Sequence, residues 1–387
     1  MSMAETMNQR VLAQTPSDIR TFNADVARID GIVRLTLGEP DFPTPEHVKQ
    51  AAIRAIQSDQ SHYLPSRGLL ALRQAASDFL RSKYGTAYDP ETQLIVTTGA
   101  TGGIYSSLTA MLNPGDTVFI PTPIFPLYIP ISQLAGGQVV CIDTSQDGFV
   151  LTPERLEAAI AQHPDTAKVL VLSFPVNPTG VTYSRQLLED LAQVARRHGL
   201  FVLSDEIYAE LTYSGKHVSM GEILPEQTVV LSGVSKSHAM TGWRIGIAAG
   251  PAPMINEIAK VSEFSVTCST TVAQYAALEA YAHGLDDAEP MRQAYRQRRD
   301  FMVQALRQVG LEVANPQGAF YLFIKLPGQM ADSWKFAYDL AQQAKVALIP
   351  GASFAAGGEG HIRLSYAASM DDLQTAAGRI AQFMAQH

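Results

Sequence analysis

The sequence predicts an α/β protein with a parallel sheet covered by helices, followed by a smaller α+β part. Between about residues 93 and 250, short β-branched and apolar runs alternate with longer segments of helical periodicity. Beyond about residue 284 the pattern changes to a long helical stretch with short strand-like pieces. The length of 387 residues also favours two domains over a single core.

Short apolar runs mark the strands expected in the large sheet. The predicted strands are residues 94–98, 117–120, 169–173, 201–204, 229–232 and 245–249. Between two of them we expect a helix that Ser184 caps and Gly199 ends. Its apolar residues fall on one face: Leu187, Leu188, Leu191, Val194 and Ala195. Such a helical crossover favours parallel strands.

The C-terminal part is expected to form the smaller domain. It begins with a helix at residues 291–309 and continues with strand-like segments at 319–325 and 362–365 and a helical tail. We expect residues 46–284 to form the large domain and residues 285–387 the small one. Residues 1–45 are expected to pack with the small domain.

Composition and charge exclude several function classes. With 37 acidic and 29 basic residues, the formal charge of −8 gives no attraction for nucleic acid. The two cysteines, Cys141 and Cys268, indicate neither a disulfide framework nor a thiolate metal site. The first 14 residues lack the pattern of a signal peptide, and no apolar run reaches membrane-spanning length. We therefore expect a cytoplasmic protein without nucleic-acid, membrane or metal partners.

The segment LSGVSKSHAMTGWRIG, residues 231–246, is the most informative of the chain. It places Lys236 directly after an apolar strand and Arg244 eight residues later. A lysine amine forms a Schiff base only when unprotonated, so its usual pKa of about 10.4 must be lowered by desolvation or a nearby cation. Arg244 can be that cation and can also bind a phosphate. A lysine at such a place is otherwise a surface residue.

Ser235 and Lys236, followed by MTGWR at residues 240–244, resemble the cofactor-lysine signature of the class I/II aminotransferases. These are the fold type I enzymes that use pyridoxal 5'-phosphate (PLP). The resemblance runs from LGEPDF at residues 37–42 to RLSYA at residues 363–367, nearly the whole chain. It implies a seven-stranded, mostly parallel sheet in the large domain and a Schiff base between Lys236 and PLP.

Asp205 stands at the carboxyl end of a predicted strand, where ligands of open α/β sheets bind. An acid there can hold a pyridine nitrogen protonated, although a helix N-cap is the alternative. The resemblance implies that Asp205 is this pyridine partner and that Tyr208 bonds the ring hydroxyl. It also implies that Asn177, in the turn-forming segment NPTG, bonds the ring hydroxyl and helps to hold the substrate carboxylate.

Gly99, Ala100 and Thr101 join a strand to an apolar helix, whose free N–H groups and dipole can bind a phosphate. The segment matches neither nucleotide-binding glycine motif. The resemblance implies that Phe125 stacks on the cofactor ring, with a core phenylalanine as the alternative. It also implies that Tyr63 reaches the phosphate of the neighbouring subunit, which requires a homodimer.

Arg363 resembles the residue that binds the substrate carboxylate as a bidentate fork, and Gly38 the backbone that lies against it. The chain departs from the family pattern at Gly233, where many members have a phosphate-binding Ser or Thr. Phosphate contacts are therefore expected to depend on Ser235, Arg244 and the turn at residues 99–101.

The resemblance implies amino transfer between an amino acid and a 2-oxo acid by ping-pong kinetics, with 2-oxoglutarate and glutamate as one pair. A lyase, decarboxylase or racemase of the same fold is the alternative. A PLP-binding domain of a transcription regulator is disfavoured, because GEPDF at residues 38–42 leaves no room for a preceding DNA-binding module. HYLPSRG and PIFP, at residues 62–68 and 123–126, are most similar to the aromatic and N-acetyl-diaminopimelate branch, and aspartate-type members share the other motifs.

Overall fold

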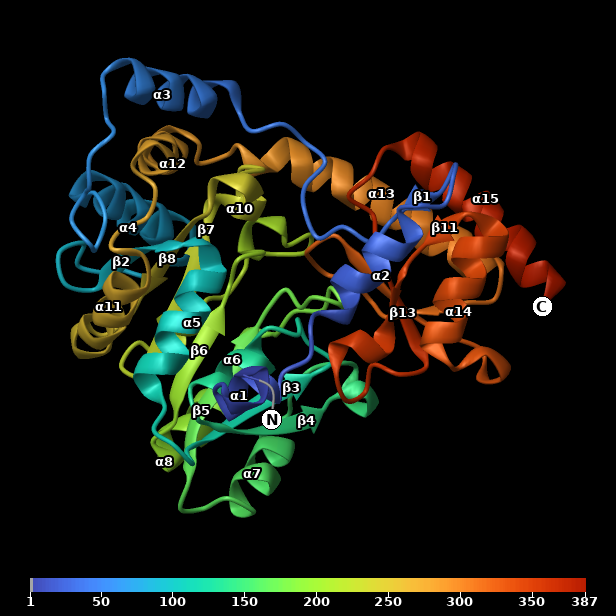
Figure 1. Ribbon diagram of the computed structural model, residues 1–387, viewed down its shortest axis with the longest axis horizontal. Coiled ribbons are helices and arrows are strands. Elements are labelled where there is room, and N and C mark those ends of the chain that lie inside the picture. The colour runs from blue at the N-terminus through green and yellow to red at the C-terminus, as the bar shows by residue number, and fades with distance from the viewer. Residues whose placement is uncertain (1–2) are drawn as a thin grey trace.

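The computed structural model describes residues 3–387 and is built around a seven-stranded sheet (Figure 1). Its strands, in spatial order, are β2 (Leu94–Thr98), β8 (Ile245–Ala249), β7 (Thr228–Gly233), β6 (Phe201–Asp205), β5 (Ala167–Ser173), β3 (Thr117–Thr122) and β4 (Gln138–Asp143). Neighbouring strands are parallel, except that β8 is antiparallel to both β2 and β7. The fold is therefore the mostly parallel α/β arrangement that was expected.

All six strands predicted from the apolar runs are present, with ends that differ by at most two residues. The structure adds β4, at the edge of the sheet beside β3. The run VVCI at residues 139–142 is the signal that could have predicted it. Because β4 is an edge strand, most of its side chains remain accessible.

Helices cover the sheet, and α8 (Arg185–His198) shows how local sequence sets their ends. The Ser184 hydroxyl accepts the Leu187 N–H at 3.2 Å, and Gly199 ends the helix at φ +63°, which confirms the predicted caps. Within residues 3–387, no helix has the length and apolar content that crossing a bilayer requires. The other helices of this part are α3 (Glu46–Gln57), α4 (Leu70–Tyr84), α5 (Gly99–Met111), α6 (Tyr128–Leu134), α7 (Pro153–Ala161), α9 (Met220–Ile223), α10 (Val234–Ser237), α11 (Ala252–Val266) and α12 (Thr271–His283).

The C-terminal part contains a second sheet, which is antiparallel and has the order β12-β13-β10-β9. Its strands are β9 (Glu312–Val313), β10 (Tyr321–Lys325), β12 (Ile349–Pro350) and β13 (His361–Ser365). The helices are α13 (Ala288–Gln308), α14 (Ser333–Asp339) and α15 (Met370–Gln386). The long helix and both strand-like segments predicted here are present, as α13, β10 and β13.

The N-terminal segment lies against the C-terminal part, as Figure 1 shows for α2 (Asp18–Val26). Strand β1 (Val33–Arg34) pairs in parallel with β11 (Val346–Ala347). Phe22, Val26 and Leu35 are buried in the same apolar cluster as β10 and α15. The short helix α1 (Gln9–Leu12) contacts α6 instead. We propose that residues 46–284 form the large domain and that most of the N-terminal segment belongs with residues 285–387.

Candidate active site

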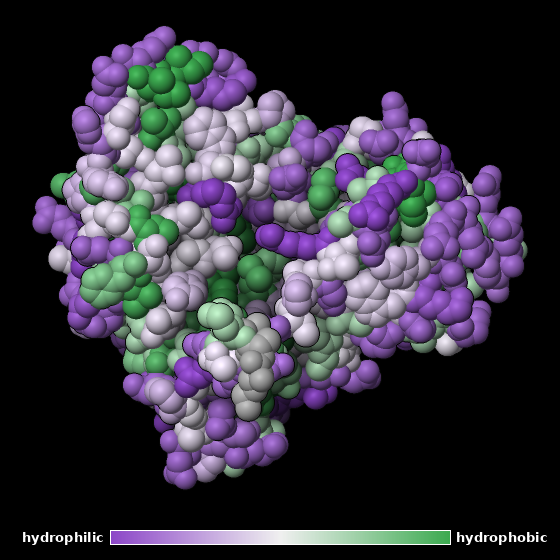
Figure 2. Space-filling view, viewed as in Figure 1, coloured by the Kyte–Doolittle hydropathy of each residue, from purple (hydrophilic) through white to green (hydrophobic). Residues whose placement is uncertain are grey.

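A cavity of about 270 Å³ lies where the N-terminal segment meets the carboxyl ends of the sheet strands. The hollow at the centre of the face in Figure 2, between the two lobes, has hydrophobic residues in its depth. Eleven of the thirteen site residues predicted from the sequence line the cavity. They are Gly38, Ala100, Thr101, Phe125, Asn177, Asp205, Tyr208, Ser235, Lys236, Arg244 and Arg363.

Lys236 enters the cavity from α10, the single turn that follows the buried strand β7. Its Nζ donates a hydrogen bond to the carbonyl of Gly38 at 2.6 Å. Desolvation lowers the pKa of Lys236 to about 8; nearby Glu39 opposes this shift, and the positive charges of Arg244 and Arg363 add to it. About a tenth of the amine is therefore unprotonated at pH 7, far more than for an ordinary lysine, and Schiff-base chemistry requires this form.

Asp205 is the last residue of β6, and it is buried with 4% of its surface exposed. Tyr128 donates its hydroxyl to Oδ2 at 2.7 Å, and the Ile207 N–H donates to Oδ1 at 3.1 Å. Burial raises the pKa of Asp205 to about 6, while these two hydrogen bonds act in the opposite direction. The carboxylate can still accept a further hydrogen bond from a group in the cavity, because each of its oxygens has two lone pairs.

Arg363, on β13, is buried with its guanidinium beside two neutral oxygens. Nη1 donates to Oδ1 of Asn177 at 3.0 Å, and Nη2 donates to the carbonyl of Thr36 at 2.6 Å. Nε has no partner, and no carboxylate of residues 3–387 forms an ion pair with this side chain. Burial lowers the pKa of Arg363. A buried cation without an anionic partner suits an anionic ligand.

Tyr208 follows Asp205 by three residues and also faces the cavity. Its hydroxyl forms a hydrogen bond with that of Tyr321 at 2.7 Å, so β10 of the C-terminal part contributes to the site. Burial raises the pKa of Tyr208, which therefore stays protonated. The site thus joins residues from both parts of the chain.

The N-terminus of α5 faces the cavity through Ala100 and Thr101. Gly99 has φ +67°, and a Cβ at this position would overlap the guanidinium of Arg244. Within residues 3–387, Nη1 of Arg244 donates to the carbonyl of Thr241, at 3.0 Å, and to no carboxylate. A Cβ on Gly233 would lie 3.0 Å from the carbonyl oxygen of Ile245, which gives a packing reason for glycine there. The N-terminus of α5 and the guanidinium of Arg244 together form a binding site for an anion, which we call the anion seat.

The two remaining predicted residues do not line the cavity. Gly99 lies directly behind it, against Arg244. Tyr63 is on the loop between α3 and α4 and is 84% exposed. Its expected contact with a neighbouring subunit lies outside a single chain.

Several residues that line the cavity were not predicted from the sequence. Tyr128 stands three residues after Phe125, at the start of α6, and its place in the same segment after a strand end could have indicated it. Ile19 and Asn23 stand four residues apart on α2, which also places them on one helix face. For Tyr321 we find no local signal. The other missed lining residues are Thr36, Leu37, Ile104, Ser173, Ile207 and Thr241.

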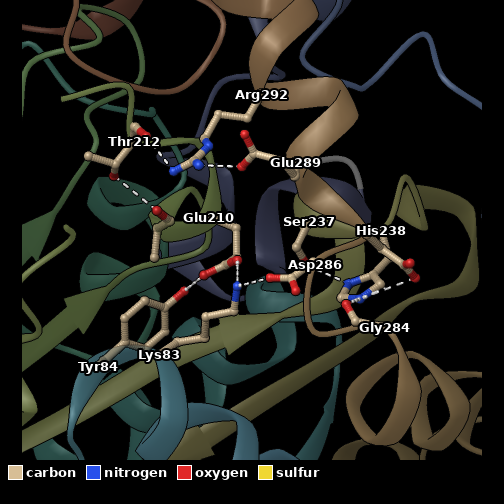
Figure 3. A network of polar contacts seen from close by, with 12 residues as sticks. Lys83, Tyr84, Glu210, Thr212, Ser237, His238, Gly284, Asp286, Glu289 and Arg292 are labelled. Carbon is tan, nitrogen blue, oxygen red and sulfur yellow. Dashed lines mark hydrogen bonds and ion pairs between the residues drawn. The ribbon is translucent and has the colours of Figure 1, made fainter. Parts of the chain in front are cut away.

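A second polar cluster, shown in Figure 3, follows Tyr208 along the chain. Nζ of Lys83 lies 3.2 Å from Oε2 of Glu210 and 3.2 Å from Oδ1 of Asp286. Tyr84 donates its hydroxyl to Glu210 at 2.5 Å. Arg292 forms an ion pair with the carboxylate of its helix neighbour Glu289. In this cluster the lysine and the arginine are neutralised by carboxylates of the chain itself.

A desolvated lysine, a buried acid and an anion seat at the carboxyl ends of a mostly parallel sheet define an α/β enzyme with an anionic cofactor. Comparison with known proteins makes this specific. The profile of the family "Aminotransferase class I and II" matches residues 30–380. The chain belongs to this family and is an aminotransferase.

Curated relatives and solved structures are similar over nearly the whole chain. The Bacillus subtilis protein "Probable N-acetyl-LL-diaminopimelate aminotransferase" is 43% identical over 382 residues, covering 99% of this chain and 96% of that protein. "Aspartate/prephenate aminotransferase" of Thermus thermophilus is 40% identical over 386 residues, 98% of each chain. The structure of Thermus thermophilus aspartate aminotransferase with maleate has a TM-score of 0.92 at 41% identity, covering 97% of this chain and 99% of that chain.

Enzymes of this family depend on PLP, and the residues of the cavity fit this cofactor. The N-terminus of α5 and the guanidinium of Arg244 suit its phosphate. Asp205 is a buried acid with free acceptor capacity, as the pyridine nitrogen needs. Lys236 has the lowered pKa that covalent attachment requires. The protein is a PLP-dependent aminotransferase.

Proposed function

We propose that the protein transfers an amino group between an L-amino acid and 2-oxoglutarate by ping-pong kinetics. The donor is aromatic, aspartate-like or N-acetyl-diaminopimelate, since relatives named for each of these activities are 35% to 43% identical to the chain. One observation carries the proposal. The amine of Lys236, with its pKa of about 8, opens into the same cavity as the buried, unpaired guanidinium of Arg363.

Each predicted residue receives a role toward PLP. Lys236 holds the cofactor covalently and Asp205 holds its ring nitrogen protonated. When bound, PLP withdraws electrons from the α-carbon of the substrate. The phosphate is held by Gly99, Ala100, Thr101, Ser235 and Arg244, the ring hydroxyl by Asn177 and Tyr208, and the ring face by Phe125.

The substrate is oriented and deprotonated by residues of this chain. Arg363 binds the α-carboxylate as a bidentate fork, with Asn177 and the backbone of Gly38 beside it. The amino group of the substrate would replace Nζ of Lys236 on the cofactor, and the amine so freed would remove the α-proton as a general base and later return a proton on the product side. A base with a pKa of about 8 suits this exchange near neutral pH, because it both accepts and releases protons there.

We further propose a homodimer in which Tyr63 reaches the phosphate in the neighbouring subunit. Tyr63 is 84% exposed and Phe264 is 85% exposed, so both side chains are accessible to a second chain. Sedimentation of the purified protein measures the assembly. Mixing a Tyr63→Phe chain with a Lys236→Ala chain tests the shared site, because the heterodimer then combines both lesions in one of its two sites and leaves the other intact.

The test of function is an absorbance spectrum of the purified protein during addition of amino acids without any oxo acid. We expect a yellow protein that bleaches with a donor and recovers with 2-oxoglutarate, and the panel of donors ranks the substrates. Continued consumption of the donor without lasting bleaching would favour a lyase of the same fold, because such an enzyme completes its turnover without an oxo acid. A colourless protein that PLP cannot reconstitute would contradict the proposal.

A further inference from the structure

A chain of hydroxyl groups ends on the buried carboxylate of Asp205. Tyr128, the first residue of α6, is 1% exposed and donates its hydroxyl to Oδ2 of Asp205 at 2.7 Å. Ser173, the last residue of β5, forms a side-chain hydrogen bond with the same tyrosine. Ser173 is also the register partner of Asp205 in the sheet. Two neighbouring strands and one helix therefore fix the position of this carboxylate.

The donors and acceptors among Ser173, Tyr128 and Asp205 follow from the number of protons that each side chain carries. An ionised carboxylate only accepts, so the single hydroxyl proton of Tyr128 points to Asp205. The tyrosine oxygen is then an acceptor for the hydroxyl of Ser173. The chain thus donates from Ser173 through Tyr128 to Asp205, and each donation favours the charged form of the carboxylate.

We propose that Tyr128 is a positioning residue for amino transfer, whose hydroxyl keeps Asp205 ionised and oriented toward the pyridine nitrogen of the cofactor. The inference rests on the proposed function, in which Asp205 holds that nitrogen protonated. Tyr128 acts only through Asp205. Its ring also packs edge-on against Phe125, with centroids 6.3 Å apart, so its packing and hydroxyl roles must be separated.

The surroundings of Asp205 explain why a donor is needed. Burial favours the protonated carboxyl and raises its pKa to about 6, and the neighbouring carboxylate of Glu206 adds to this effect. Lys236 opposes it with a positive charge, and Tyr208 is the other ionisable group that senses the charge of Asp205. Apart from Tyr128, the hydrogen-bond donor to the carboxylate is the Ile207 N–H.

Loss of the hydroxyl therefore shifts Asp205 toward its protonated form. A protonated carboxyl no longer stabilises a proton on the pyridine nitrogen, so activity is lost on the acid side of the pH profile. A hydrogen bond to a charged group corresponds to about one pKa unit or slightly more. In the pH profile of kcat, the midpoint of the acid limb should accordingly move to a pH about one unit higher.

The experiment compares the Tyr128→Phe holoenzyme with wild type. We expect the upward shift of the acid limb, a fall of about fivefold in kcat at pH 6 with KM changed less than about twofold, and an altered visible spectrum of the bound cofactor at pH 6 without substrate. Ser173→Ala should shift the acid limb in the same direction by less.

A matched control removes a different buried tyrosine hydroxyl. Tyr183 is 6% exposed, accepts the Leu151 N–H at 3.1 Å and lies outside the cavity lining. Tyr183→Phe should lose thermal stability without moving the acid limb or the spectrum. An acid limb and cofactor spectrum in Tyr128→Phe that match those of Tyr183→Phe would contradict the inference.

Fluorination tests the same point without removing the hydroxyl. Replacement of Tyr128 by 3,5-difluorotyrosine gives a stronger hydrogen-bond donor and should move the acid limb downward; an unchanged limb would overturn the inference even if Tyr128→Phe did not fold. Failure of the proposed function is distinct from this outcome. In that case wild type itself would bind no PLP or transfer no amino group.

Discussion

The cavity around Lys236 and the polar cluster around Lys83 contain the same kinds of side chain, but they differ in how the charges are paired. Lys83 meets Glu210 and Asp286, and Arg292 meets Glu289 (Figure 3). Within residues 3–387, Lys236 donates its hydrogen bond to the carbonyl of Gly38 and forms no ion pair with a carboxylate. Within the described part of the chain, Arg244 and Arg363 likewise bind neutral oxygens only.

Whether a cation is paired with a carboxylate of the chain distinguishes side chains that stabilise the fold from side chains that are available to bind an anionic ligand. Paired charges at the Lys83 cluster are already neutralised and contribute to folding. An unpaired cation that is buried, as Arg363 is, costs desolvation energy, and the binding of an anion offsets this cost. In the proposed reaction, the cofactor phosphate would form an ion pair with Arg244, and the substrate carboxylate would form one with Arg363. Matched substitutions in the two regions test this distinction.

The largest effect is expected at the lysines. Lys236→Ala should reduce kcat by at least about 10³-fold while PLP still binds noncovalently, because both the attachment point and the base are lost. Lys83→Ala should leave kcat within about threefold and cost about 1 kcal/mol of unfolding free energy. Steady-state kinetics and denaturant unfolding of both variants measure this. Full activity of Lys236→Ala would refute the assignment.

Substitution of the unpaired Arg363 should change KM more than substitution of the paired Arg292. Arg363→Lys replaces a bidentate fork by a point charge and should raise KM for the amino acid by about 10- to 100-fold. Arg292→Lys, in the paired cluster, should keep KM within about twofold. Kinetics with one donor and one acceptor compare the two. Equal effects of the two changes would remove the distinction between paired and unpaired cations.

The pH dependence of cofactor capture follows from the pKa of about 8 at Lys236. Only the unprotonated amine reacts, so the rate of PLP capture by apoprotein should rise about fivefold between pH 7 and 8 and less than about twofold between pH 8 and 9. The unfolded chain binds more protons between the folded pKa and about 10.4, so this group makes stability increase with pH in that window. A capture midpoint near 10.4 would show that the amine is not desolvated.

The smallest effect is expected at two glycines with similar backbone angles. Gly99 has φ +67° and its added Cβ would overlap Arg244, whereas Gly215 has φ +72° and open space around it. Gly215→Ala should cost only the backbone strain, about 1–2 kcal/mol. Gly99→Ala should cost more and also weaken PLP binding, because Arg244 must move. Thermal unfolding and PLP titration of both variants check this, and equal PLP affinity would argue against Arg244 at the anion seat.

The sequence predicted the features that depend on local pattern. The caps of α8 at Ser184 and Gly199 and the position of Asp205 at a strand end follow from neighbouring residues. The contacts of Tyr128 with Asp205 and of Tyr208 with Tyr321 join residues 77 and 113 positions apart, and such pairing depends on the tertiary fold. Strand β4 also had a local signal, the run VVCI, although it was not among the predicted strands. The role of Tyr63 depends on a second chain and stays a prediction.

The stoichiometry of a single half-reaction tests the central claim most directly. Purified holoenzyme is mixed with excess donor amino acid and no oxo acid, and the released 2-oxo acid is counted against protein subunits. The account predicts one 2-oxo acid per subunit, no further release until 2-oxoglutarate is added, and no release from Lys236→Ala. Continuous release without an acceptor, or none from wild type with any donor of the panel, would contradict amino transfer at Lys236.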